Sequence, residues 1–309
     1  MPTPPPAIAL TEVTCQFGRI RALDQLSLAV PAGTVGGIVG PNGAGKTTVI
    51  DLVSGLLRPD TGRVTVLGED VRRRAQAVRR QIGVVPQETA LYEELTPGQN
   101  LQFAAALYGV PNPARRIAEL LKMVGLTGRA QDAVRTLSGG MQRRLSSMRA
   151  LLHDPAVLLL DEPTLGVDME ARHQIWAHIR GLRAQGRTIL LTTNYLDEAE
   201  ALCDRVAILR AGKLLAEDTP AALVAQAGRC IELECPKDAA ARLEVTLRQE
   251  PGVLRTQVNG TGLTVYLNGH RAPEDLVQQA RVIAPLAGFR TRSPDLAEVF
   301  KALAVERAA

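Results

Sequence analysis

The stretch GPNGAGKTT at residues 40–48 constrains this chain more than any other feature of its sequence. Gly40, Gly45, Lys46 and Thr47 stand at the spacing of a phosphate-binding loop. Glycine lets backbone N–H groups approach a phosphate where a Cβ would block them, the lysine supplies a mobile positive charge, and the threonine hydroxyl can bind Mg²⁺. We expect the whole stretch to bind the phosphates of a nucleotide, namely Gly40, Pro41, Asn42, Gly43, Ala44, Gly45, Lys46, Thr47 and Thr48.

The residues around this loop have the patterns that such a loop requires. The short apolar run Gly36–Val39 predicts a buried strand before it. Apolar residues follow at helical spacing between Val49 and Leu57. A strand, a glycine loop and a helix N-terminus together form an anion site, because the first N–H groups of a helix have no partner within the helix.

The remainder of the first 228 residues predicts an α/β fold. Two alternating segments, Ala7–Thr14 and Leu23–Val30, predict a small antiparallel sheet added to the nucleotide core. Residues 88 to about 155 have mainly helical spacing. From Ala156 onwards apolar strands alternate with helices, which predicts a parallel core sheet with helices on both faces.

The composition changes near Gly228, where we expect a second domain to begin. The elements after it follow the order βαββαβ, with a hairpin predicted at Asn259–Gly262, and this order indicates a small ferredoxin-like α+β domain. We therefore divide the chain into a proline-rich tail at residues 1–6, a nucleotide-binding domain at 7–228 and an accessory domain at 229–309.

Bulk properties exclude several classes of protein. The net charge of +4 is too small to indicate nucleic-acid binding by itself, and the basic run Arg72–Arg74 is interpreted as a solvated helix face. The 4 cysteines lack metal-binding spacing and are expected to be reduced, as in a cytosolic protein. No apolar stretch approaches the ~18 residues of a membrane span, and the N-terminus lacks the pattern of a secretory signal. A membrane function would then require docking on another chain.

Three further segments supply groups for phosphate chemistry. Asp161 and Glu162 follow the apolar run Ala156–Leu160, so that Asp161 can hold Mg²⁺ and Glu162 can polarise a water molecule for attack on a γ-phosphate. Gln87 ends another predicted strand and can bind the same metal. A second glycine pair at a helix start, in residues 137–141, predicts a second anion site. One nucleotide in one compact core does not need both.

This set resembles the nucleotide-binding subunits of ATP-binding-cassette transporters from about Ala7 to Gly228. The resemblance implies a P-loop ATPase that binds ATP and Mg²⁺, dimerises head to tail as a homodimer or heterodimer, and drives a separate permease from the cytoplasmic face of the membrane. Each ATP would then lie between one chain's phosphate loop and the signature segment of the other, Leu137, Ser138, Gly139, Gly140 and Met141. The resemblance also implies that Phe17 stacks on adenine and that Asp168 couples the two sites. The helical subdomain at about 88–155 would meet the permease.

The subfamily is also indicated by the sequence. Met141 replaces the commoner glutamine of the signature segment. The stretches EPTLGVD and LAEVF resemble exporters of drugs, lipids and polysaccharides, such as the daunorubicin-resistance type. The role of the accessory domain stays open at this point.

One position departs from the family's pattern, because Asn194 stands where the resemblance implies a catalytic histidine. Asparagine can donate one hydrogen bond to a γ-phosphate but cannot carry charge. Two alternatives to a transport ATPase therefore stay open. One is a slowly hydrolysing regulatory subunit, which Asn194 favours and Glu162 opposes. The other is a non-transport cassette ATPase acting on nucleic acid, which the single phosphate loop opposes. Arg143 and Arg144 face either solvent or the surroundings of ATP, and Trp176 is interpreted as a packing residue.

Overall fold

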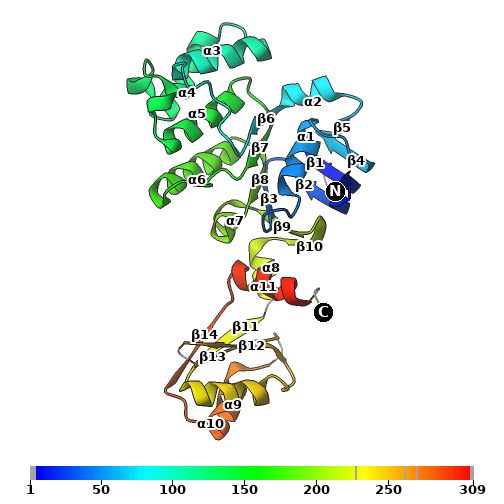
Figure 1. Ribbon diagram of the computed structural model, residues 1–309, viewed down its shortest axis with the longest axis vertical. Coiled ribbons are helices and arrows are strands. Elements are labelled where there is room, and N and C mark those ends of the chain that lie inside the picture. The colour runs from blue at the N-terminus through cyan, green and yellow to red at the C-terminus, as the bar shows by residue number, and fades with distance from the viewer. Residues whose placement is uncertain (1–4, 227, 261, 269–270, 307–309) are drawn as a thin grey trace. The chain divides into compact units, whose positions relative to one another are not determined.

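The computed structural model describes residues 5–226, 228–260, 262–268 and 271–306. The chain divides into two compact units, Met1–Glu217 and Asp218–Ala309, which are described separately. This division lies before the boundary that we expected after Gly228, because α8 (Pro220–Gln226) packs with α11 (Leu296–Glu306) of the second unit (Figure 1). The tail predicted at residues 1–6 lies mostly outside the described residues.

A six-stranded sheet forms the centre of the first unit. Its strand order is β10-β9-β3-β8-β7-β6. The five neighbouring strands β9, β3, β8, β7 and β6 are parallel to one another, as predicted. Every residue of β3, β7 and β8 is buried, which fits the mainly apolar sequences of these strands. The strands are β3 (Val35–Val39), β6 (Ile82–Val85), β7 (Val157–Asp161), β8 (Thr188–Thr193), β9 (Arg205–Arg210) and β10 (Lys213–Asp218).

An antiparallel sheet of order β2-β1-β4-β5 accompanies the parallel one, as the two alternating segments predicted. Its apolar side packs with α1 and with one face of the parallel sheet in a single core cluster. Figure 1 shows α1 and this antiparallel sheet on one side of the parallel sheet, with α6 and α7 on the other. The strands are β1 (Ile8–Phe17), β2 (Ile20–Val30), β4 (Thr61–Val66) and β5 (Glu69–Asp70).

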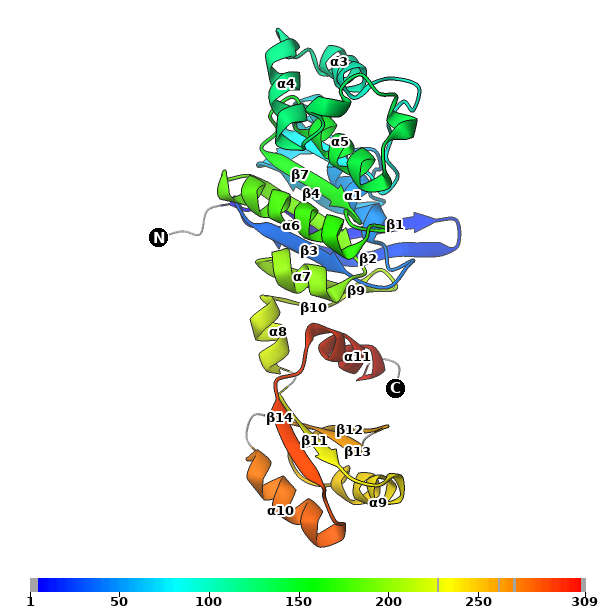
Figure 2. The ribbon, with the colours of Figure 1, turned by 90° about the vertical axis from the view of Figure 1, so that its left-hand side faces the viewer.

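Helices α3, α4 and α5 form the predicted helical part of the first unit, grouped together in Figure 2. Thr96 and Gln99 form a reciprocal capping box at the start of α3, and Pro97 occupies its first turn. The helices of the first unit are α1 (Lys46–Ser54), α2 (Ala75–Gln81), α3 (Pro97–Tyr108), α4 (Pro113–Met123), α5 (Gly139–Leu151), α6 (Met169–Ala184) and α7 (Leu196–Leu202), with short 3-10 helices at Thr127–Arg129 and Val134–Thr136.

Helix α2 begins at Ala75, so the exposed run Arg72–Arg74, which we interpreted as a helix face, lies in the turn before the helix. Asp70 holds the first residues in a turn instead: its Oδ1 accepts hydrogen bonds from the backbone N–H groups of Arg72 and Arg73 at 3.0 and 3.2 Å. An aspartate at such a position competes with a helix for backbone donors.

The second unit has the predicted βαββαβ order and an antiparallel sheet of order β12-β13-β11-β14. Alternate residues of the sheet, such as Ile231 and Leu233, join α9 and α10 in a separate core. Strands β12 and β13 form the predicted hairpin, although Thr261 of its turn lies outside the described residues. The elements are β11 (Arg229–Glu234), α9 (Lys237–Leu247), β12 (Val253–Asn259), β13 (Gly262–Leu267), α10 (Pro273–Ile283) and β14 (Gly288–Arg292).

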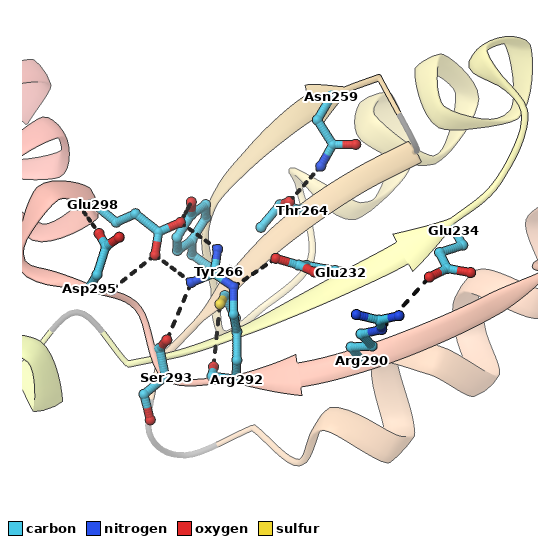
Figure 3. Close-up of polar contacts among 11 residues, drawn as sticks. Glu232, Glu234, Asn259, Thr264, Tyr266, Arg290, Arg292, Ser293, Asp295 and Glu298 are labelled. Atoms are coloured by element: carbon cyan, nitrogen blue, oxygen red, sulfur yellow. Dashed lines mark hydrogen bonds and ion pairs between the residues drawn. The ribbon is translucent and has the colours of Figure 1, made fainter.

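The other face of this sheet is polar, and Glu298 ties α11 to it (Figure 3). The carboxylate accepts two hydrogen bonds from the Arg292 guanidinium, at 2.6 and 2.8 Å, and one from the Tyr266 hydroxyl at 2.5 Å. These hydrogen bonds, chiefly those from Arg292, lower the pKa of Glu298 to about 2. Burial and the neighbouring Glu298 carboxylate raise the pKa of Tyr266 to about 12. Polar pairing therefore helps to fix the start of α11, where the apolar side chains of Leu296 and Val299 are also buried.

Candidate functional site

The phosphate loop connects β3 to α1, as the sequence predicted. Gly45 caps α1 with a φ of 103°, a backbone conformation that favours glycine. A Cβ at Gly40 would stand 2.2 Å from the carbonyl oxygen of Leu209, and one at Gly45 would stand 2.5 Å from that of Ala22. Local packing therefore requires both glycines, independently of any phosphate.

Lys46 brings the phosphate loop together with the end of β7. Its side chain is only 5% exposed, and Nζ donates a hydrogen bond to the carbonyl oxygen of Gly40 at 2.9 Å. Nζ also forms an ion pair with Oε1 of Glu162 at 3.1 Å. The lysine expected to bind phosphate and the glutamate expected to activate water are thus direct neighbours within one chain.

The backbone at the end of β7 holds the two carboxylates in different environments. Glu162 has a φ of 47°, which is uncommon for a residue with a side chain, and its N–H donates to the carbonyl and hydroxyl oxygens of Thr192. The Thr192 hydroxyl in turn donates to Oδ1 of Asp161. Strand β8 therefore fixes Asp161 and redirects Glu162 towards Lys46.

Arg143, on α5, joins three parts of this site. It is 5% exposed, and its guanidinium donates hydrogen bonds to the carbonyl oxygens of Pro86, Gln87, Asp161, Glu162 and Pro163 at 2.5–3.1 Å. Burial lowers the pKa of Arg143, and the nearby carboxylates of Asp161, Glu198 and Glu162 oppose that shift. The question left open from sequence is answered for this residue: it faces neither solvent nor a nucleotide but the main chain of the catalytic segments.

The signature segment lines a separate hollow of about 200 Å³. Ser138 caps α5 by accepting a hydrogen bond from the Met141 N–H at 3.3 Å, and Leu137 is buried. Asp168 lines the same hollow and caps α6 by accepting from the Ala171 N–H at 3.0 Å. The structure thus brings the signature segment and Asp168 together on one surface, to which Arg144 also contributes.

Four predicted site residues lie at exposed positions. Thr47 follows Lys46 in α1, Gln87 follows β6, and Asn194 follows β8. Phe17 ends β1 with half of its side chain exposed. Within the described ranges no group of three or more His, Cys, Asp or Glu residues could hold a metal ion. The oxygen groups of Thr47, Gln87 and Asp161 are nevertheless of the hard type that Mg²⁺ prefers when phosphates complete its coordination.

Glu198 is a buried site residue that the sequence did not indicate. It accepts hydrogen bonds from the Thr164 hydroxyl at 2.9 Å and the Trp176 indole N–H at 3.0 Å, and burial raises its pKa. It thereby links α7 and α6 to the segment after Glu162. Trp176 was interpreted as a packing residue, and it is buried as well as hydrogen-bonded. The signal in the sequence that could have pointed to Glu198 is Trp176, because a buried indole N–H usually needs a hydrogen-bond acceptor.

Comparison with known proteins identifies the family. The family described as ABC transporter matches residues 23–165. The chain is 41% identical over 298 residues to the Nod factor export ATP-binding protein I of Rhizobium sp. (strain N33), which covers 95% of each chain. The chain belongs to the ATP-binding proteins of ABC transporters. It is also 42% identical over 263 residues to the daunorubicin resistance ATP-binding protein DrrA3 of Streptomyces coeruleorubidus, covering 84% of this chain and 80% of the relative.

Solved structures agree with this family. An ATP-binding subunit of an ABC transporter superposes with a TM-score of 0.65 at 31% identity, covering 71% of this chain and 92% of that one. A dimeric ATP-binding cassette in a post-hydrolysis state, bound to ADP and Pi, superposes with a TM-score of 0.63 at 28% identity, covering 69% and 98%. This ABC protein binds ATP and is an ATPase that energises a separate membrane permease. In the part of the chain that the structure describes, none of the helices has the length and apolar character of a membrane span.

Replacing Arg143 by Met should damage both stability and turnover. The substitution leaves five carbonyl oxygens, in buried or partly buried bonds, without their common donor. We expect the free energy of unfolding of the first unit to fall by about 3 kcal/mol and ATP turnover to fall about tenfold or more. Urea unfolding and steady-state hydrolysis measure the two effects. Arg180→Met, at an exposed position on α6, is the control, and equal stabilities of the two variants would contradict this role.

Proposed function

We propose that two cassettes close head to tail around two MgATP molecules, each held between the phosphate loop of one chain and Ser138–Gly140 of the other. One observation carries this proposal. Lys46 and Glu162 are 3.1 Å apart within one chain, whereas the signature segment lines a different hollow together with Asp168. A second chain supplies the missing half of each site.

The ion pair of Lys46 with Glu162 allows ATP to make the Glu162 carboxylate available for catalysis. A γ-phosphate is an anion that competes with Glu162 for the Lys46 ammonium group. Phosphate binding therefore frees the carboxylate to orient a water molecule and accept its proton. Contacts of ATP that exist only in the closed dimer shift the population towards that dimer, and hydrolysis reverses the shift.

Mg²⁺ would be held by Thr47, Gln87 and Asp161. Asp161 suits this role because it is buried and its carboxylate is fixed by the Thr192 hydroxyl. When bound with ATP, the ion neutralises negative charge on the β- and γ-phosphate oxygens. Phe17 offers an exposed ring for stacking on adenine, and Asp168 couples the two sites from its position beside the signature segment.

The transported compounds are proposed from the relatives. These relatives are named for Nod factor export and daunorubicin resistance. We propose an exporter of drugs, lipids or polysaccharides, with this chain on the cytoplasmic face of the membrane. A slowly hydrolysing regulatory subunit remains the second candidate, and Asn194 is the observation that favours it. Action on nucleic acid has no comparable support.

The apolar side chains that α3 exposes form the surface that we propose for the permease. Leu107 is 71% exposed, and Phe103 and Tyr108 are nearly half exposed. Leu107→Glu should abolish co-purification with the permease subunit while leaving ATP binding intact, because a carboxylate is costly to bury in an apolar interface. Val282→Glu, at an even more exposed apolar position in the second unit, is the control. Retention of the permease by the Leu107 variant would exclude this surface.

Glu162→Gln should trap an ATP-bound dimer. The amide cannot act as a base and no longer competes as an anion for Lys46, so we expect turnover to fall by about 10²–10⁴-fold while ATP binding persists. Size-exclusion chromatography with MgATP should show a dimer for this variant and not for Glu170→Gln, whose substitution lies in the first turn of α6. A monomer at saturating MgATP would count against the proposed closure.

Asn194→His should raise the rate of single-turnover hydrolysis. A histidine side chain is longer than asparagine and can carry a positive charge, and one well-placed preorganised donor is worth about 10²–10³-fold in rate. Asn194→Ala should lower the rate further. A rate that histidine leaves unchanged or reduces would show that Asn194 does not limit hydrolysis.

A further inference from the structure

A hollow of about 490 Å³ in the first unit is lined mainly by arginines. It lies among the segment after α1, the strands β4 and β5, and the turn before α2. Its charged lining residues are Arg58, Arg63, Asp70, Arg72 and Arg73, and we call it the arginine hollow. Its volume lies within the range of about 300–1,000 Å³ that small-molecule sites occupy.

Asp70 does not neutralise the arginine hollow. Its carboxylate pairs with Nε of Arg63 at 2.9 Å and accepts the backbone N–H groups of Arg72 and Arg73 at 3.0 and 3.2 Å. Among the described residues, no ion pair involves the side chains of Arg58, Arg72 or Arg73. The carboxylate therefore fixes the turn and offsets one of the four charges, which leaves three guanidinium groups without a counter-charge around the same hollow.

The segment around the hollow carries the whole excess charge of the chain. Residues 58–80 contain 7 arginines, no lysine and 3 acidic residues, which is an excess of 4 positive charges. The net charge of all 309 residues is also +4. Basic charge is thus concentrated in one segment, while the rest of the chain is balanced. Such a concentration attracts an anion that carries several charges.

Two observations favour a lipid surface over a soluble polyanion. Exposed leucines accompany the arginines: Leu56, 75% exposed, stands two residues before Arg58, and Leu67, 40% exposed, lies in the turn between β4 and β5. An anionic membrane offers partners for both kinds of side chain, whereas the phosphates of a nucleic acid attract only the basic ones. Figure 1 also shows α2 at the same end of the first unit as α3, whose apolar side chains we propose for the permease.

We propose that the arginine hollow binds the phosphate headgroup of an anionic phospholipid at the membrane surface beside the permease. Guanidinium groups form paired hydrogen bonds with phosphate oxygens. Because Asp70 already holds the backbone of Arg72 and Arg73, little ordering of the turn remains when the lipid binds. The placement of the hollow beside a membrane rests on the proposed function, since that function brings this chain to the permease.

Vesicle flotation tests this site on the full chain, without permease or nucleotide. We expect binding to phosphatidylcholine vesicles that contain about 30% phosphatidylglycerol to be about tenfold tighter or more than binding to phosphatidylcholine alone, because only the former carry net negative charge. Binding should weaken between about 0.1 and 1 M salt, where the Debye length falls from about 10 to about 3 Å.

The double variant Arg72→Gln, Arg73→Gln should weaken binding to the anionic vesicles about tenfold or more, because each basic residue near such a surface contributes about fivefold. Both side chains are exposed, so the variant should keep its free energy of unfolding. The matched control is Arg79→Gln, Arg80→Gln. These exposed arginines belong to the same segment and remove the same charge, but they are not among the described residues that line the hollow. We expect the control to weaken binding only about twofold, because charge outside the hollow acts through a screened field.

Equal weakening by the two double variants would overturn the hollow as the site, and so would equal binding to both kinds of vesicle. Tighter binding to single-stranded RNA than to the anionic vesicles would overturn the lipid in favour of nucleic acid. If Arg72→Gln, Arg73→Gln keeps vesicle binding but loses co-purification with the permease in detergent, the hollow binds an acidic segment of the permease instead. The vesicle measurements need neither ATP nor dimer closure. A failure of Glu162→Gln to dimerise would therefore leave the lipid site intact, and a failure of vesicle binding would leave the proposed closure intact.

Discussion

The guanidinium of Arg143 is the interaction on which the rest of the catalytic arrangement depends. A buried charge is tolerated only with many hydrogen bonds, and here five main-chain carbonyl oxygens supply them. These carbonyls belong to the segments that carry Gln87 and Glu162, while Arg143 itself follows the signature segment in α5. One side chain thus positions, relative to one another, the groups that we propose to bind the metal, activate water and face the second chain. Movement of α5 must be transmitted to the carboxylates.

The ion pair between Lys46 and Glu162 suggests that the site can exist in two states, one with Glu162 bound to Lys46 and one with phosphate bound there instead. Both side chains are nearly buried, so the ion pair has little solvent screening, and an incoming phosphate must offer a better counter-charge. The left-handed backbone at Glu162, fixed by Thr192, aims the carboxylate at the lysine. Because we propose the same carboxylate for water activation, a single exchange of partners would link nucleotide binding to catalysis. In that proposal Glu162 becomes available for hydrolysis only when a nucleotide is present.

The sequence predicted those parts of the site that are local in the chain. The phosphate loop and the Asp161–Glu162 pair each lie within a few residues of a buried strand, where spacing alone defines geometry. Arg143 escaped prediction because its partners are carbonyl oxygens, which leave no trace in side-chain identity. Glu198 was missed for a similar reason, since its partners are distant in sequence. Strand β10 was also missed, because an edge strand with charged residues has no apolar run.

Arg144 is best understood beside Arg143, its neighbour in α5. Arg143 faces the segments after β6 and β7 and has every donor used in main-chain bonds. Arg144 instead lines the signature hollow and donates a hydrogen bond to the Gln174 side chain of α6. Helix α5 therefore carries two adjacent arginines that bond to different parts of the fold. Because Arg143 holds the segments that carry Gln87 and Glu162, and Arg144 joins α5 to α6 beside the signature hollow, α5 connects the two surfaces that we propose to meet in the closed dimer.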